Sequence, residues 1–285
     1  MFASLAVAAA VAASGPATMA EWHTACDGKE GWSDPAPPLH VFGNTYDVGT
    51  CNITVLLITS SKGHVLLDGA TAEAAPSIAA NIERLGFKLS DVKLIGASHE
   101  HFDHVGGVAE LQRLTGATVM SMPAAYLTFE TGIVNREDPQ WGLHKPFPAA
   151  KVGIMLSDGF VARQGPLSLT AYATPGHAPG STTWSWRSCD GKRCVNVVYA
   201  DSVSAVSADE YRFSDHKKYV AAFRDSLFKI ARLRCDLLIT PHPSASKFYE
   251  RLAGEAPLID RNACKAYADR GRAALDERLA KEQAK

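Results

Sequence analysis

Residues 98–107 read SHEHFDHVGG and place three histidines and one aspartate within six positions: His99, His101, Asp103 and His104. Alternate residues of an extended chain face the same way, so His99 and His101 can point at one place. Imidazole and carboxylate groups are the nitrogen and oxygen ligands that zinc takes in proteins. The pattern H-x-H-x-D-H therefore predicts a metal site.

Two more histidines follow segments with the composition of strands. His177 lies after a Pro-Gly turn in TPGHAPG, and His242 follows the apolar run of CDLLITPHP. Loops at strand ends often carry functional residues, so both histidines can reach the same site. The remaining histidines are expected to be surface or hydrogen-bonded residues: His23, His40, His64, His144 and His216.

The candidate ligands, five histidines and one aspartate, exceed what one tetrahedral zinc can bind. Two ions with three protein ligands each would use all six and keep positions open for water, as catalytic zinc does. Paired metal ions about 3.5–4 Å apart can stabilise both the attacking and the leaving group of a hydrolysis. We therefore expect two Zn2+ ions per chain and hydrolytic chemistry.

The charge balance argues against a nucleic-acid partner. The 285 residues include 29 Lys and Arg and 30 Asp and Glu, a formal net charge of −1, without a dense basic run. Phosphate binding needs a basic surface, which this chain lacks. Beyond the N-terminus, no apolar run reaches the roughly 18 residues of a membrane helix. We expect a monomer that acts on a small molecule, without a nucleic-acid or membrane partner.

The N-terminus has the character of an export signal. Residues 2–13 are almost wholly apolar, and Thr18 and Ala20 have the spacing of a signal-peptidase site, although a basic segment is missing. We interpret residues 1–20 as a signal peptide, cleaved after Ala20, and expect a periplasmic protein with a single domain at 21–285. The alternative is a buried alanine-rich helix.

The cysteine count agrees with export. Six cysteines, an even number, favour disulfides in an exported chain, although six cysteines allow 15 connectivities. Cys189 and Cys194 flank the turn sequence DGKR, where a bridge closes easily. No pair has C-x-x-C spacing, which weakens a zinc-ribbon or redox interpretation.

Strand and helix patterns alternate along both halves of the chain. Two such halves favour an α/β fold, an αββα sandwich of two mixed sheets with helices outside. The expected strands and hairpins lie at 52–70, 92–98, 118–122, 167–177, 182–202 and 235–243, and the expected helices at 71–87, 108–117, 217–233 and 264–283.

Residues 131–151 join the two halves and show no regular period. A loop of this length is often a lid or a binding loop, and the alternative is a loosely packed connector. We expect Trp141, within this loop, to be exposed.

The segments HEHFDHVGG, PGH and TPHP resemble the metallo-β-lactamase superfamily, whose fold is an αββα sandwich. Within it, YADSVSA, YRFSDH and the cysteine placement are most similar to zinc β-lactamases of class B, third subclass. The H-x-H-x-D-H motif alone is specific only for the superfamily. The resemblance to the subclass covers nearly the whole mature chain.

The resemblance implies a role for each candidate residue. His99, His101 and His177 would hold one zinc ion, and Asp103, His104 and His242 the other. No cysteine stands beside Asp201, so a cysteine-containing second site is not available. Ser202 and Ser204 would bind the carboxylate of the substrate, and Gln140 and Trp141 would flank the site. The implied disulfides are Cys26–Cys51, Cys189–Cys194 and Cys235–Cys264.

The implied activity is zinc-dependent hydrolysis of the β-lactam amide of penicillins, cephalosporins and carbapenems, which gives antibiotic resistance. The nucleophile would be a metal-bound hydroxide, oriented by Asp103 as the catalytic residue. We expect Asp201 to support the scaffold without touching metal. The alternative for Ser202 and Ser204 is that both only satisfy backbone groups in a turn.

Three other functions are open to such a metal site. One is a thioesterase or lactonase of the type-two glyoxalase kind, which would want an aspartate bridging the metals, close to Asp201. A second, a non-catalytic exported zinc protein, leaves the open metal positions unexplained. The third, a nuclease, fits badly with the absence of a basic surface.

Overall fold

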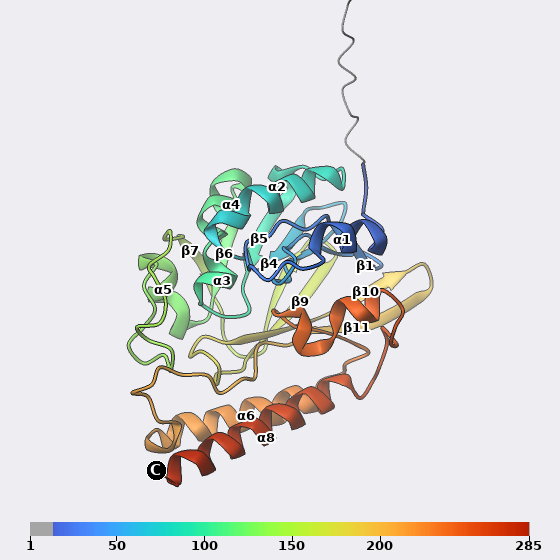
Figure 1. Ribbon diagram of the computed structural model, residues 1–285. Helices are drawn as coiled ribbons and strands as arrows, with labels where there is room; N and C mark the ends of the chain where they lie inside the picture. The colour runs from blue at the N-terminus through green and yellow to red at the C-terminus, as the bar shows by residue number, and fades with distance from the viewer. Residues whose placement is uncertain (1–13, 285) are drawn as a thin grey trace, which may run out of the picture.

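The computed structural model describes residues 14–284 (Figure 1). The apolar segment at 2–13, on which the export prediction depends, lies outside the described residues. The expected cleavage point after Ala20 falls within the first turn of helix α1 (Met19–Cys26), whose N-terminus is capped by Thr18. In residues 14–284 no helix is both long enough and apolar enough to cross a membrane.

The first sheet has seven strands in chain order. Neighbours from β1 to β4 are antiparallel, and those from β4 to β7 are parallel. Parallel pairing of β4, β5 and β6 brings their carboxyl ends to one edge of the sheet. The strands are β1 (Leu39–Phe42), β2 (Thr45–Asp47), β3 (Leu56–Ile58), β4 (His64–Leu67), β5 (Val92–Gly96), β6 (Thr118–Ser121) and β7 (Val152–Met155).

The second sheet has five strands in the order β12-β11-β10-β9-β8. All neighbours are antiparallel except β11 and β12, so β9, β11 and β12 run in the same direction. Their carboxyl ends therefore share one edge. The strands are β8 (Phe160–Gln164), β9 (Leu167–Ala173), β10 (Thr182–Asp190), β11 (Arg193–Tyr199) and β12 (Leu237–Ile239).

The two sheets stack face to face, with helices on both outer faces (Figure 1). Helices α2 and α4 cover the first sheet, and α6 and α8 run side by side over the second. The helices are α1, α2 (Ala75–Arg84), α3 (Phe102–Val105), α4 (Val108–Thr115), α5 (Tyr126–Thr131), α6 (Lys217–Arg232), α7 (Phe248–Leu252) and α8 (Ala263–Gln283), with short 3-10 helices at Ala72–Ala74, Leu89–Asp91, Pro123–Ala125, Phe213–Asp215 and Pro243–Ser246.

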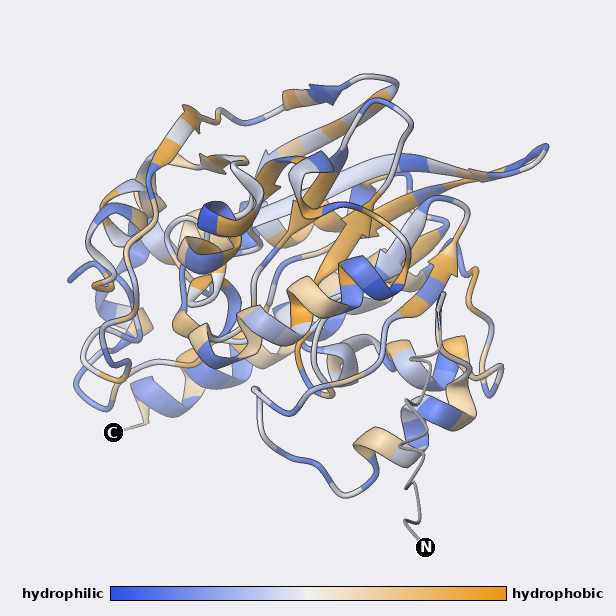
Figure 2. Ribbon diagram, turned by 90° about the horizontal axis from the view of Figure 1, so that it is seen from above, coloured by the Kyte–Doolittle hydropathy of each residue, from blue (hydrophilic) through white to orange (hydrophobic). Residues whose placement is uncertain are grey.

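Apolar side chains fill the three spaces between these four layers. Strand β9 shows why: Leu167, Leu169 and Ala171 alternate with polar residues, so one face of the strand packs into the space between the sheets. Buried Trp184 and Trp186 of β10 fill the same space. Figure 2 shows the apolar strands at the centre of the molecule. The predicted αββα sandwich is confirmed.

The structure contains the same three disulfides that the resemblance implied. Cys26–Cys51 ties α1 to the loop between β2 and β3, and Cys189–Cys194 closes the β10–β11 hairpin. Cys235–Cys264 joins the segment before β12 to the first turn of α8. Helix α8 is thereby fixed beside the second sheet.

Candidate metal centre

The predicted ligands meet where strands of both sheets end. His99 and His101 follow β5, and Asp103 and His104 lie on the short helix α3. His177 follows β9, and His242 follows β12. These strand ends lie at one edge of the sandwich, so residues up to 143 positions apart in the sequence can face one another.

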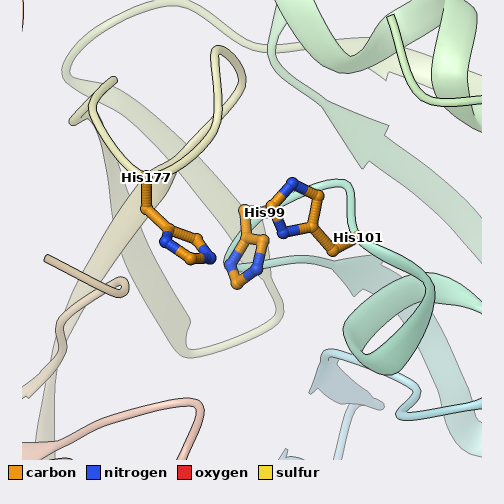
Figure 3. Close-up of side chains that lie close together, drawn as sticks. All are labelled: His99, His101 and His177. Atoms are coloured by element: carbon orange, nitrogen blue, oxygen red, sulfur yellow. The ribbon is translucent and has the colours of Figure 1, made fainter. Parts of the chain in front are cut away.

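His99, His101 and His177 form the first group of donors. One ring nitrogen of each lies within 4.8 Å of those of the others, and all three side chains are buried. Figure 3 shows the His99 ring between the other two. The rings meet edge to face, with centroids 4.6–5.0 Å apart. Convergence of three nitrogens is the arrangement that a metal ion needs.

The second nitrogen of each of these rings is held by an oxygen atom. His99 Nδ1 lies 2.8 Å from Asp201 Oδ1, and His101 Nε2 lies 3.0 Å from Asp138 Oδ2. His177 Nδ1 lies 3.0 Å from Ser204 Oγ. A carboxylate or hydroxyl on the far side of a ligand histidine fixes its ring and tautomer, leaving the other nitrogen for metal.

Asp103, His104 and His242 form the second group. Asp103 Oδ2 lies 3.1 Å from His104 Nε2 and 3.3 Å from His242 Nε2, and the two imidazole nitrogens are 3.3 Å apart. The far nitrogen of His104, Nδ1, lies 3.3 Å from Asp68 Oδ2. His99 also lies within 4.8 Å of Asp103 and His104, so the two groups are adjacent. The structure thus brings all six predicted ligands together.

Electrostatics favour a cation in this cluster. Burial and the neighbouring histidines hold the pKa values of His99 and His177 well below the usual range, so both rings are neutral, the form that binds metal. Burial lowers the pKa of His104, but the Asp103 and Asp68 carboxylates outweigh it and raise that pKa to about 10. The acidic groups therefore attract positive charge to the second group.

The donor atoms fit zinc. His99 Nε2 is buried and has no hydrogen-bond partner within residues 14–284, although buried polar atoms are normally satisfied. A metal ion among the three ring nitrogens would satisfy it. Three nitrogens in one group, and two nitrogens with a carboxylate oxygen in the other, are ligand sets of catalytic zinc.

Asp201 lies behind His99. Its Oδ1 is hydrogen-bonded to His99 Nδ1, and Tyr267 Oη donates to its backbone carbonyl at 3.1 Å. One carboxylate oxygen of Asp201 is therefore engaged by the ring of His99, and the scaffold role of Asp201 stays a prediction. A bridging role, which a type-two glyoxalase-like enzyme would need, does not follow from this placement.

Three residues beside the ligands were not predicted from the sequence: Asp68, Asp138 and His144. Asp68, just after β4, accepts hydrogen bonds from Ser98 Oγ at 2.7 Å and Tyr199 Oη at 2.6 Å, besides facing His104. The ring of His144, a residue expected to be a surface or hydrogen-bonded histidine, lies 4.5 Å from that of His101, centroid to centroid. Its place in the predicted binding loop was the only available signal.

Three of the four predicted substrate contacts, Gln140, Ser202 and Ser204, lie beside the donor groups. Gln140 Nε2 lies 3.3 Å from His177 Nε2, whereas the Trp141 side chain is 48% exposed and contacts the Arg136 guanidinium. Ser202 and Ser204 line a cavity of about 390 Å3 together with His242. Both serines therefore border the metal cluster.

A family model described as "Metallo-beta-lactamase superfamily" matches residues 48–191, half of the chain. The metallo-β-lactamase MIM-1 from Novosphingobium pentaromativorans is 47% identical, with a TM-score of 0.90 over 93% of this chain and 98% of that one. MEM-A1, a subclass B3 metallo-β-lactamase from a soil metagenome, is 43% identical, with a TM-score of 0.86 over 89% and 99%.

Curated relatives match over a shorter stretch. A hydroxyacylglutathione hydrolase from Rhodopseudomonas palustris (strain BisB5) is 34% identical over 128 residues, which are 42% of this chain and 41% of the relative. The chain thus spans less than half the length of that relative, whereas the match to the subclass B3 structure is nearly complete. The chain belongs to the metallo-β-lactamase superfamily, as a metal-dependent hydrolase of subclass B3.

Proposed function

We propose that this chain hydrolyses the amide bond of β-lactam antibiotics with two bound Zn2+ ions and so confers resistance to them. The observation that carries the proposal is the pair of adjacent three-donor groups, His99–His101–His177 and Asp103–His104–His242. They lie in a chain whose sequence is 47% identical to that of a metallo-β-lactamase. Each group leaves coordination positions free for water and substrate.

Zinc bound there would supply Lewis acidity and make a water molecule nucleophilic near neutral pH. The protein positions the reacting groups. Asp103 is the proposed catalytic residue, because its carboxylate lies between His104 and His242 and can accept a hydrogen bond from the attacking water. Burial raises the pKa of Asp103, but the His104 imidazole outweighs it and keeps the carboxylate ionised.

Substrate contacts are assigned to the residues that border the metal cluster. Ser202 and Ser204 would donate hydrogen bonds to the carboxylate of the lactam from the cavity beside His242. Gln140 is buried against His177 and would contact the reacting amide, whereas exposed Trp141 would cover the variable substituents.

We further propose that the protein is exported to the periplasm as a monomer. A signal peptide at 1–20 would precede a single domain at 21–285. Three disulfides support this location, because such bonds persist in oxidising compartments.

A hydrolysis panel tests the proposal: a carbapenem, a penicillin, a lactone and a glutathione thioester, each with the zinc-loaded protein. We expect turnover of the two β-lactams, loss of activity on dialysis against a chelator, and recovery with added zinc. Clavulanate, which targets serine β-lactamases, should have no effect. Preferred turnover of the thioester or the lactone, or full activity without metal, would overturn it.

A further inference from the structure

The cavity beside His242 has one positively charged lining residue that the proposed mechanism does not use. Arg270 of α8 lines it together with Ser202, Ser204 and His242. Within residues 14–284 no carboxylate lies within ion-pair distance of Arg270. A guanidinium carries five N–H donors and a fixed positive charge, so most of its donors are available to a ligand.

Helix α8 brings Arg270 to the same cavity as Ser202 and Ser204. Tyr267, Arg270, Gly271 and Ala274 have the i, i+3, i+4, i+7 spacing of one helix face, and all four line the cavity. Tyr267 Oη donates to the Asp201 carbonyl at 3.1 Å. A side chain at Gly271 would lie 2.8 Å from Val203, so α8 and the segment 201–204 are in close contact.

The Arg270 guanidinium is held at the rim of the cavity. One Nη donates to the Ala245 carbonyl at 3.2 Å, and the guanidinium carbon lies 5.8 Å from the centre of the Tyr267 ring. These contacts restrict the long side chain, which lowers the entropy lost when it binds a ligand. They do not neutralise its charge.

We propose that Arg270 is a specificity-determining residue that forms an ion pair with the carboxylate of the substrate, with Ser202 and Ser204 as neutral donors in the same cavity. The inference rests on the proposed function. According to it, the cavity binds an anionic group of the substrate next to the scissile amide. Lactams without such a group should therefore bind poorly. A planar guanidinium can pair with both carboxylate oxygens at once.

The test compares a penicillin with its methyl ester in the wild type, Arg270→Ala, Arg270→Lys and Arg272→Ala. Arg272 is a matched control on the same helix, because it is ion-paired with Asp269 at 3.0 Å and does not line the cavity. For the free acid, we expect Arg270→Ala to raise KM about tenfold with kcat within about twofold. A tenfold change in KM corresponds to the weakest of the hydrogen bonds that involve a charged group. We expect this strength because the Arg270 side chain is exposed to solvent.

For the ester, Arg270→Ala should leave KM unchanged, and Arg270→Lys should restore part of the binding of the acid. An unchanged KM for the acid, or an equal rise for acid and ester, would overturn the proposal, because a structural effect treats both alike. If the wild type hydrolyses no β-lactam, the proposed function fails. Calorimetric binding of the acid and the ester to the same variants then decides the role of Arg270: equal affinities overturn it.

Discussion

Removal of the Cys235–Cys264 disulfide should destabilise the protein more than removal of the hairpin disulfide Cys189–Cys194. The first bridge spans a sequence separation of 29 residues and the second a separation of 5. A longer closed loop restricts the unfolded chain more. In the chain-entropy model the bridges contribute about 3.6 and about 2.1 kcal/mol to the free energy of unfolding, respectively.

The matched variants are the double alanine substitutions at each pair, since alanine avoids burying a serine hydroxyl at Cys264. For a domain of this size, each 1 kcal/mol changes Tm by about 2–4 °C, so the expected losses are about 7–14 °C and about 4–8 °C. Urea unfolding followed by tryptophan fluorescence, at fixed zinc concentration, gives the free energies directly. Equal losses, or a larger loss for the hairpin pair, would refute the loop-length argument.

Three further results are expected. Asp103→Asn should retain about one zinc ion per chain and lose on the order of 10²-fold in kcat/KM, because Asp103 belongs only to the second donor group; two bound ions with a near-normal rate would contradict this. Ser202→Ala combined with Ser204→Ala should chiefly raise the KM for β-lactams, about tenfold, with zinc content intact because the Ser204 carbonyl still lies 3.1 Å from His177 Nδ1; an unchanged KM would make both serines bystanders. Burial raises the pKa of Glu282, but Arg278 and the Phe213 and Ser214 amides outweigh it and lower that pKa from 4.5 to about 2. Between pH 4.5 and about 2 the unfolded chain therefore binds more protons than the folded chain, so lowering the pH through this window should reduce the free energy of unfolding. The reduction should be steeper for the wild type than for Glu282→Gln, and equal pH dependence of the two in urea unfolding would contradict this.

The ligands could be predicted from the sequence because each stands in a local pattern. His99 and His101 alternate within one extended segment, and His177 and His242 follow recognisable strands. The sandwich was predictable for the same reason, since strand and helix periods are local properties of the chain.

The residues that orient the ligands could not be found this way. Asp138 contacts His101 across 37 positions, and Asp68 supports Ser98 across 30, so no short spacing links the partners. His144 reaches His101 through a loop without a regular period, whose path depends on tertiary packing. The orientation of Ser204 likewise depends on a segment without regular secondary structure.

Asp68 joins the two halves of the molecule at the metal centre. It follows β4 with a φ of 70°, accepts hydrogen bonds from Ser98 of the first half, and binds Tyr199 of β11 in the second sheet. One buried carboxylate thus connects the two sheets, and a shift of one sheet relative to the other would disturb His104. Apart from Asp138, Asp201 and Ser204, which hold the rings of ligand histidines, the residues of the loop at 132–151 and of the segment at 201–208 take no part in this connection. We expect substitutions among those residues to alter which substrates are accepted while the metal-binding frame stays rigid, so that substrate range can evolve separately from catalysis.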